Sequence, residues 1–367
     1  MKITAVEIYK LNVPLKEPFV IAIQTITNAN SVLVKINTDS GIYGWGECNP
    51  YSSIVNETQD SCYEIGAILA KILRGENPLA TTHCIGLMNR HVVKNRCIKS
   101  AFDMALFDIA SKAANVPLYQ FLGGQNNRKI ETDMTVGIGS PEKMAASALQ
   151  FKNDGFQAIK VKLGTNTKDD VERIRQIRTA IGFDIPLRID ANQGWDEDTA
   201  LNTLKALEWF EIEHCEQPIH ARNITGLARI TNLSPIPIMA DESVFDAADA
   251  LILVENHACD FFNIKLAKSG GIREALKINA IAEAAGIECQ IGCFSETRLA
   301  MSALMHFALA CPNVVHFDMD APLMLSEDPI LRGVKYGEKG LVTIGEDIGI
   351  GADVDADFLK EMTCLVV

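Results

Sequence analysis

The sequence lacks any apolar run long enough to cross a membrane. It has 367 residues, and no stretch reaches the roughly 18 consecutive apolar residues that a spanning helix needs. The longest candidate, residues 299–310, is interrupted by Ser302 and His306 and predicts a buried helix. The amino terminus enters strand-like alternation directly at Ile3, without the apolar core of a secretory signal. We therefore predict no membrane partner and no export signal.

The sequence also lacks closely spaced cysteine pairs, an excess of basic residues and compositionally biased tracts. The ten cysteines form no C-x-x-C pair, which predicts reduced, buried thiols and a cytoplasmic location. Lys and Arg number 34 against 47 Asp and Glu, a net charge of −13, which argues against nucleic-acid binding because that function needs a basic face. With 48% hydrophobic residues and this length, the chain can bury a large core without disulfides or structural metals.

What is present begins with an α+β segment. Alternating residues 3–11, 31–37 and 42–47 predict an antiparallel meander, with a turn at 39–41. Apolar residues at helical spacing then predict amphipathic helices over 60–73 and 99–114.

From about residue 131 short apolar runs alternate with helical stretches. The eight runs predicted as strands are 132–136, 158–163, 186–190, 214–216, 236–241, 261–266, 288–291 and 314–318. Asp190, Glu216, Asp241 and Lys265 follow one another at spacings of 26, 25 and 24 residues. One strand, one helix and two loops occupy about this length, so the pattern predicts a (β/α) barrel. The tail from residue 333 is expected to pack against the amino-terminal part.

Three carboxylates would converge at one rim of this barrel. Asp190, Glu216 and Asp241 lie where consecutive strands end, and barrel enzymes place their catalytic groups at that face. Bare carboxylates so close would repel each other, and an all-oxygen ligand set favours Mg²⁺ over Zn²⁺. A single carboxylate of this kind is more often a helix cap, but three at nearly equal spacing predict a magnesium site.

Lysines flank the predicted metal site. Lys160 and Lys162 point to the same face of one strand, about 7 Å apart, and their mutual repulsion is expected to lower the pKa of at least one ammonium group. Lys265 ends the sixth strand, across the barrel. A cation on a substrate carboxylate would stabilise the charge left when the neighbouring carbon loses a proton. Two lysines on opposite sides of that carbon could then invert it.

At these positions the sequence resembles the enolase superfamily, muconate-lactonizing subgroup. The matching segments are GWGEC (44–48), SAFDMALFDIASKAANVPLYQFLGG (100–124), KVKLG (160–164), RIDANQGW (188–195), CEQP (215–218), ADES (240–243) and NIKLAKSGGI (263–272). The resemblance implies an α/β fold, a modified (β/α)7β barrel with an α+β capping domain. We expect the capping domain at 1–125, the barrel at 126–332 and a tail at 333–367.

The resemblance also implies Mg²⁺ on Asp190, Glu216 and Asp241, and Lys162 and Lys265 as the acid/base pair. Lys160 would tune Lys162 and contact the substrate carboxylate.

The pair Asp318 and Asp320 follows the eighth strand and resembles the D-x-D of the dipeptide epimerases. There it binds the α-ammonium group of the substrate, and two acids at a barrel mouth suit a cationic amine. Thr135 stands where those epimerases have a substrate-contacting residue. The resemblance therefore implies inversion of the α-carbon of the second residue of a dipeptide. A cycloisomerase or o-succinylbenzoate synthase of the same subgroup is the alternative, and a non-catalytic binding barrel is a third.

Specificity is expected from a loop over residues 18–30 of the capping domain. Epimerases acting on Ala-Glu resemble each other in carrying an Arg there, whereas this segment has no cation, and Gln24 stands near that place. The Val20, Ile21 and Ile23 side chains make the segment apolar. We therefore predict a preference for hydrophobic dipeptides over Ala-Glu. These three side chains could equally pack beneath the loop. Cys293 is expected to line the pocket.

Remaining polar residues are assigned supporting roles. Glu242 and Asn192 are expected to support the metal site, and Lys268 is predicted to be a solvated loop lysine. Subgroup members are commonly oligomeric, so analogy implies a homo-oligomer.

Overall fold

Eight parallel strands form the centre of the molecule. The computed structural model describes all 367 residues, and the sheet order β12-β11-β10-β9-β8-β7-β6-β5 follows the chain. The strands are β5 (Met134–Val136), β6 (Ile159–Lys162), β7 (Leu187–Asp190), β8 (Ile212–Glu216), β9 (Ile238–Ala240), β10 (Phe261–Ile264), β11 (Glu288–Ile291) and β12 (Val314–Phe317). Each overlaps one of the eight predicted runs. The Asp133 amide donates to the Phe317 carbonyl at 3.1 Å and links the last strand to the first.

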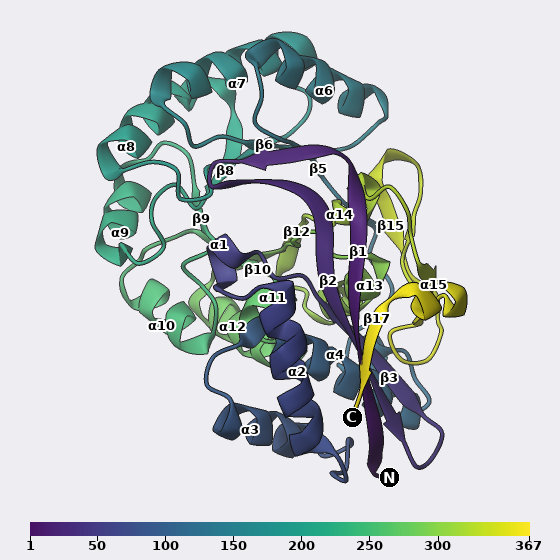
Figure 1. Cartoon of the computed structure of the whole chain (residues 1–367). Helices are drawn as coiled ribbons and strands as arrows, with labels where there is room; N and C mark the ends of the chain where they lie inside the picture. Colours follow the sequence, from purple (N-terminus) through teal and green to yellow (C-terminus); the bar gives the residue numbers. More distant parts are fainter.

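Seven helices connect these strands and surround them (Figure 1). They are α6 (Pro141–Asn153), α7 (Thr167–Ile181), α8 (Glu197–Ala206), α9 (Ile224–Leu233), α10 (Ala247–Glu255), α12 (Ile272–Ala285) and α13 (Arg298–Ala310). Short helices α11 (Leu266–Ser269) and α14 (Ala321–Met324) follow β10 and β12. Polar N-cap residues begin several of the longer helices. The Asn166 side chain accepts a hydrogen bond from the Asp169 amide at the start of α7, and the Asp196 side chain accepts one from the Thr199 amide at the start of α8. The predicted (β/α)7β barrel is confirmed.

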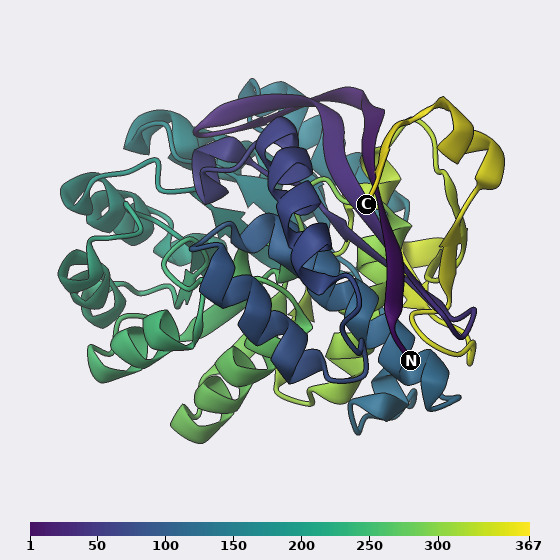
Figure 2. The same ribbon diagram turned by 60° about the horizontal axis from the view of Figure 1, so that its bottom comes forward.

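An antiparallel sheet with the order β17-β1-β2-β3 covers one end of the barrel. Its strands are β1 (Ile3–Ile21), β2 (Gln24–Thr38), β3 (Tyr43–Cys48) and β17 (Thr363–Val366), and helices α1 (Ser52–Val55), α2 (Gln59–Leu73), α3 (Thr81–His91), α4 (Arg96–Ala113) and α5 (Leu118–Phe121) follow β3. Figure 2 shows β17 beside β1, at the carboxyl terminus. The last strand of the chain therefore pairs with the first.

The segment predicted as a loop over 18–30 is a β-ribbon. Strands β1 and β2 continue through it, with Phe19 opposite Ile26 and Ile21 opposite Gln24, and reverse at residues 22–23. The prediction of a loop was wrong because cross-strand pairing extends the two strands beyond the alternation visible in the sequence. The ribbon arches over the barrel (Figure 1).

The rest of the carboxyl-terminal segment is a set of short elements beside the barrel. They are β13 (Ile330–Arg332), β14 (Lys335–Tyr336), β15 (Leu341–Thr343), β16 (Ala352–Val354) and α15 (Ala356–Glu361). Strand β15 pairs with both β14 and β4 (Ile130–Glu131), the strand that precedes the barrel. No helix combines the length and the apolar character needed to span a bilayer.

A buried carboxylate joins the capping sheet to the barrel. Glu47 of β3 accepts from the Ser31 hydroxyl at 2.8 Å and from the Thr297 hydroxyl at 2.6 Å. It also accepts from the backbone amides of Thr297 and Ala300 at the start of α13. A carboxylate at a helix N-terminus is favoured by the helix dipole. This arrangement explains the Glu of the GWGEC segment as a structural residue.

Both glycines of that segment allow β3 to touch α4. A Cβ atom on Gly46 would lie 1.9 Å from the Ala101 carbonyl oxygen, and one on Gly44 would lie 2.1 Å from that of Ala105. Both obstacles are backbone atoms of a long helix, which cannot rotate away as a side chain can.

Gly46→Ala is therefore expected to destabilise the protein by about 2 kcal/mol or more, as overpacking of a core does. Gly86→Ala is the matched control, because its Cβ would meet only Arg90 at 3.5 Å inside helix α3, and alanine favours a helix interior by up to about 1 kcal/mol. Urea unfolding should give a lower free energy of unfolding than wild type for Gly46→Ala and a higher one for Gly86→Ala. Equal shifts would contradict this account of the β3–α4 contact.

A buried histidine predicts acid sensitivity of the fold. The His306 Nδ1 atom accepts from the Tyr119 amide at 3.1 Å, and burial lowers the pKa of the ring to about 4. An unfolded chain titrates near 6.5, so it binds more protons than the native state between pH 6.5 and 4. The neutral histidine thus contributes stability above pH 6.5 that is lost as the pH falls toward 4, up to about 3 kcal/mol.

His306→Asn keeps an acceptor for the Tyr119 amide and removes the titration. Unfolding free energies measured from pH 7 to pH 4 should fall less steeply for this variant than for the wild-type protein. Parallel curves would show that His306 does not contribute to the pH dependence.

Candidate active site

Three carboxylates meet where consecutive barrel strands end. Asp190 is the last residue of β7, Glu216 is the last residue of β8, and the two are register partners. Asp241 directly follows β9. All three side chains are at most 1% exposed. The chain spacing therefore brings these predicted residues to one rim, as neighbouring parallel strands require.

Lys160 lies between the acids. Its ammonium nitrogen donates to Glu216 Oε2 at 2.7 Å and to Asp318 Oδ2 at 2.8 Å, and it is 3.4 Å from Asp190 Oδ2. Burial alone would lower the pKa of Lys160, but Asp318, Glu216 and Asp190 together raise it well above its usual value. The expected lowering by lysine repulsion does not occur at Lys160, because the nearby carboxylates outweigh the neighbouring ammonium. Lys160 is also absent from the cavity wall described below.

Two further lysines face one cavity from opposite sides of the barrel. Lys162 of β6 donates to Asp190 Oδ2 at 2.6 Å. Lys265, directly after β10, lies 2.9 Å from Asp241 Oδ2, and its ammonium nitrogen is 5.0 Å from the centre of the Phe294 ring. Both lysines line a cavity of about 40 Å³. The structure thus brings the two predicted bases to the same space.

Lys268 is buried, and the prediction of a solvated loop lysine was wrong. Its ammonium group lies 2.8 Å from Asp241 Oδ1 and donates to the Asp241, Val244 and Asn263 carbonyls. Helix α11 begins immediately after β10, so a single turn places Lys265 and Lys268 on the same side. An i, i+3 spacing after a barrel strand is the signal that could have revealed this.

The predicted ammonium-binding pair also reaches the cavity. Asp318 and Asp320 line it together with Thr135 and Cys293. Burial would raise the pKa of Asp318, but Lys160 and then Lys265 lower it overall. Burial and the Asp318 charge raise the pKa of Asp320 to about 7, and Asp320 Oδ2 accepts from the Thr135 amide at 2.8 Å. Thr135 therefore contacts Asp320 through its backbone.

The capping part and the barrel loops together supply an apolar wall to the cavity. Phe19 and Ile21 come from the segment over which specificity was expected, whereas six further lining residues were not predicted: Tyr51, Ile54, Phe294, Ser295, Ala321 and Met324. Tyr51 and Phe294 stack with ring centroids 4.7 Å apart. Gln24 is half-buried and does not line the cavity, whereas its partner Ile21 does. The capping part and the barrel bring residues as distant in the chain as Phe19 and Met324 to one wall, and no local sequence pattern indicates such a contact.

The donor set at the rim suits a hard cation. The carboxylate oxygens of Asp241 are buried and each faces an ammonium group, that of Lys268 at 2.8 Å and that of Lys265 at 2.9 Å. Asn192 Oδ1 and Glu242 Oε2 are buried without a donor, and Asn192 Nδ2 donates to Glu242 Oε1 at 3.2 Å. Oxygen atoms left without donors are costly unless a cation or water meets them. Carboxylate and amide oxygens are the ligands that Mg²⁺ takes, so Asp190, Glu216 and Asp241 fit such an ion.

Family models match both parts of the chain. Residues 3–123 match the mandelate racemase / muconate lactonizing enzyme N-terminal domain, and residues 143–358 match the enolase C-terminal domain-like family. The chain belongs to the enolase superfamily. The resemblance seen in the sequence motifs is thereby confirmed over nearly the whole length.

Relatives in this superfamily are similar over their full length. The chain is 46% identical to the D-Ala-D/L-Ala epimerase of Cytophaga hutchinsonii, covering 100% of both chains. It is 42% identical to the hydrophobic dipeptide epimerase of Enterococcus faecalis, covering 96% of this chain and 99% of that one. A crystal structure of the dipeptide epimerase from Cytophaga hutchinsonii, complexed with Mg and D-Ala-L-Val, matches with 46% identity, a TM-score of 0.99 and full coverage of both chains.

Proposed function

We propose that this protein is a magnesium-dependent dipeptide epimerase that inverts the α-carbon of the second residue. The observation that carries the proposal is the pair of lysines, Lys162 and Lys265, which face one cavity beside three carboxylates and the Asp318–Asp320 pair. The similar Cytophaga hutchinsonii and Enterococcus faecalis proteins are named for this reaction class.

Asp190, Glu216 and Asp241 would hold the magnesium ion. When bound, the ion supplies positive charge beside the substrate carboxylate and so stabilises the negative charge that develops there. Lys160 holds Glu216 and Asp318 in place and keeps the buried acids partly neutralised. Asn192 and Glu242 support the same rim through their mutual hydrogen bond.

Lys162 and Lys265 would exchange the α-proton from opposite faces. One neutral amine removes the proton from the α-carbon, and the ammonium of the other donates a proton to the opposite face. The configuration inverts because the two nitrogens approach from different sides. Each lysine has a carboxylate partner, Asp190 or Asp241, that orients it.

Asp318 would bind the free α-ammonium of the dipeptide, with Asp320 beside it. Both acids are buried at the cavity wall. Asp318 already pairs with Lys160, whereas Asp320 has no ammonium partner, and a buried carboxylate of this kind favours a cationic ligand. This feature separates the proposal from cycloisomerase activity, because muconate and succinylbenzoate carry no ammonium group.

The lining of the cavity suits a hydrophobic second residue better than a glutamate. The wall contains Phe19, Ile21, Ile54 and Met324, and its only cationic side chains are Lys162 and Lys265. A glutamate carboxylate placed there would lose its hydration without gaining a partner of its own. We propose that the β-ribbon sets this preference through Ile21, which lies in the cavity wall, and not through its partner Gln24, which lies outside the wall.

A panel of dipeptides in D₂O tests both activity and preference. With Mg²⁺, mass spectrometry should show α-deuteration, with kcat/KM higher for Ala-Val and Ala-Leu than for Ala-Glu. EDTA should abolish the exchange, and N-acetylated dipeptides, which lack the ammonium, should react poorly. Absence of exchange across the panel would refute the epimerase function, whereas faster exchange of Ala-Glu would refute only the preference.

We also propose the division into a capping domain (1–125), a barrel (126–332) and a tail (333–367). A separate buried cluster of 23 residues, most of them in the first 110 residues, supports the first boundary.

All ten cysteines are unpaired, which supports a reducing compartment such as the cytoplasm.

A further inference from the structure

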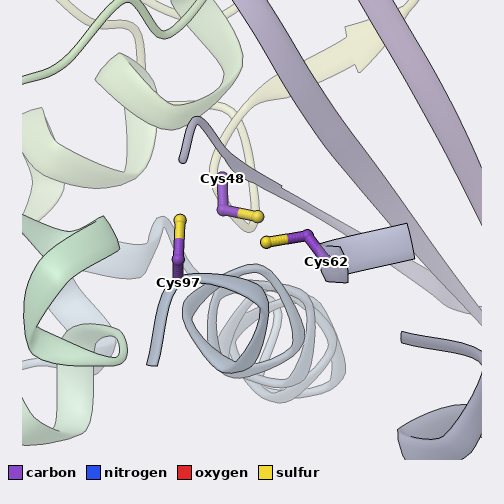
Figure 3. A group of neighbouring side chains, drawn as sticks. All are labelled: Cys48, Cys62 and Cys97. Atoms are coloured by element: carbon purple, nitrogen blue, oxygen red, sulfur yellow. The ribbon is translucent and has the colours of Figure 1, made fainter. Parts of the chain in front are cut away.

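Three buried cysteines converge in the capping part, away from the barrel mouth. Cys48 is the last residue of β3, Cys62 lies in the first turns of α2, and Cys97 lies in the first turn of α4. Their sulfur atoms all lie within 4.8 Å of one another, and each residue is fully buried. Figure 3 shows the sulfurs of Cys48 and Cys62 pointing toward each other, with that of Cys97 directed into the same space.

The surroundings favour negative charge on one of these sulfurs, that of Cys62. Cys62 and Cys97 lie near the N-termini of helices of 15 and 18 residues, where the helix dipole stabilises thiolates. Hydrogen bonds from the thiols of Cys48 and Cys97 lower the pKa of Cys62, while burial raises the pKa of both Cys48 and Cys97. The trio can therefore hold one thiolate shared by two donors, rather than three independent thiols.

A carboxylate connects this cluster to the surface. Glu57 accepts from the backbone amide of Cys97 at 2.8 Å, and its Oε2 atom lies 3.4 Å from the Cys62 sulfur. Glu57 also lines a surface hollow of about 640 Å³ together with Asn56, Asn95 and other loop residues. An ion entering from this hollow would meet the Glu57 carboxylate first and then the sulfurs.

We propose that Cys48, Cys62 and Cys97 form a binding site for a soft, thiolate-seeking d¹⁰ cation such as Cu(I), Zn²⁺ or Cd²⁺. Soft thiolate ligands select such ions over Mg²⁺. Three thiolates that surround a metal ion in one plane at a metal–sulfur distance of ~2.3 Å have their sulfur atoms about 4.0 Å apart. The three sulfur atoms therefore need to approach one another by less than about 1 Å to ligate one ion. As the ion binds, the remaining thiol protons pass to solvent.

The position of the three residues distinguishes this site from ordinary core packing. Buried cysteines elsewhere, such as Cys84, Cys215 and Cys259, belong to no such trio. The three cysteines come from three separate chain segments, the end of one strand and the starts of two helices. They lie next to Glu57, which also lines the surface hollow. The proposal stands independently of the epimerase function, since it uses none of the residues assigned to the active site.

Anaerobic titration of the reduced protein with Cd²⁺, in saturating Mg²⁺, tests the proposal. The near-ultraviolet band of thiolate-to-cadmium charge transfer reports sulfur ligation, which the oxygen ligands at the barrel rim cannot produce. A Cys364→Ser parent removes the exposed thiol. The expected result is a band that saturates at one ion per chain, with Zn²⁺ and Cu(I) displacing the cadmium.

Matched serine variants identify the ligands. Cys48→Ser, Cys62→Ser and Cys97→Ser should each weaken Cd²⁺ binding by at least about tenfold. Cys84→Ser, which changes a buried cysteine on α3 outside the trio, should leave both the band and the affinity unchanged. Circular dichroism and α-deuteration activity of each variant report whether it is folded. The proposal is overturned if the parent shows no saturable band, or if folded variants of the trio bind as tightly as the parent.

Discussion

Replacing either Lys162 or Lys265 with alanine is expected to abolish epimerisation while sparing proton exchange with one diastereomer. Each lysine serves one face of the α-carbon, so the remaining lysine can still remove and return a proton on its own side. A positioned general base contributes roughly 10²–10⁴-fold, so loss of either base should lower the epimerisation rate by at least about 10²-fold. The two variants should exchange opposite diastereomers, because their surviving bases approach from opposite sides of the cavity.

Measurement requires both diastereomers of one dipeptide, incubated separately in D₂O with Mg²⁺ and analysed for deuterium and for configuration. Lys168→Ala is the matched control, since this lysine at the start of α7 is exposed and should leave both rates unchanged. If both active-site variants exchange the same diastereomer, or if one of them still epimerises at the wild-type rate, the two-base mechanism is excluded.

The positions of the three active-site carboxylates could be predicted because they depend on the spacing of residues along the chain. Asp190, Glu216 and Asp241 end consecutive strands, and parallel strands joined by similar helices must bring such residues to one edge. The eight strand positions followed from short apolar runs, because strands buried on both faces have few polar residues. The roles assigned to these residues came from the family resemblance in addition to the spacing.

Features that depend on contacts between distant segments were not accessible in this way. The β-ribbon was predicted as a loop, because its pairing depends on the register between β1 and β2. The burial of Lys268 depends on how α11 turns back toward Asp241. The cysteine trio is spread over 50 residues of sequence, and only the packing of β3, α2 and α4 brings its sulfurs together.

The role of Lys160 leads to a prediction about stability as well as activity. This lysine contacts Asp190, Glu216 and Asp318, all of which are buried. Lys160→Met keeps much of the side-chain volume but leaves the carboxylates without this cation. Removal of one partner from a buried ionic cluster costs about 3–5 kcal/mol, so the variant should unfold at much lower urea concentration in EDTA.

Mg²⁺ should stabilise the Lys160→Met variant more than it stabilises the wild-type protein. Without the lysine, the acids carry more net negative charge, so they gain more from a divalent cation, and ligand binding to the native state raises the unfolding free energy. Lys112→Met is the matched control, because it breaks the ion pair between Lys112 and buried Asp108 at 2.7 Å, on helix α4 of the capping part. Its loss of stability should be the same with Mg²⁺ and with EDTA. Equal stabilisation of Lys160→Met and wild type by Mg²⁺ would mean that Lys160 does not share its carboxylates with the metal.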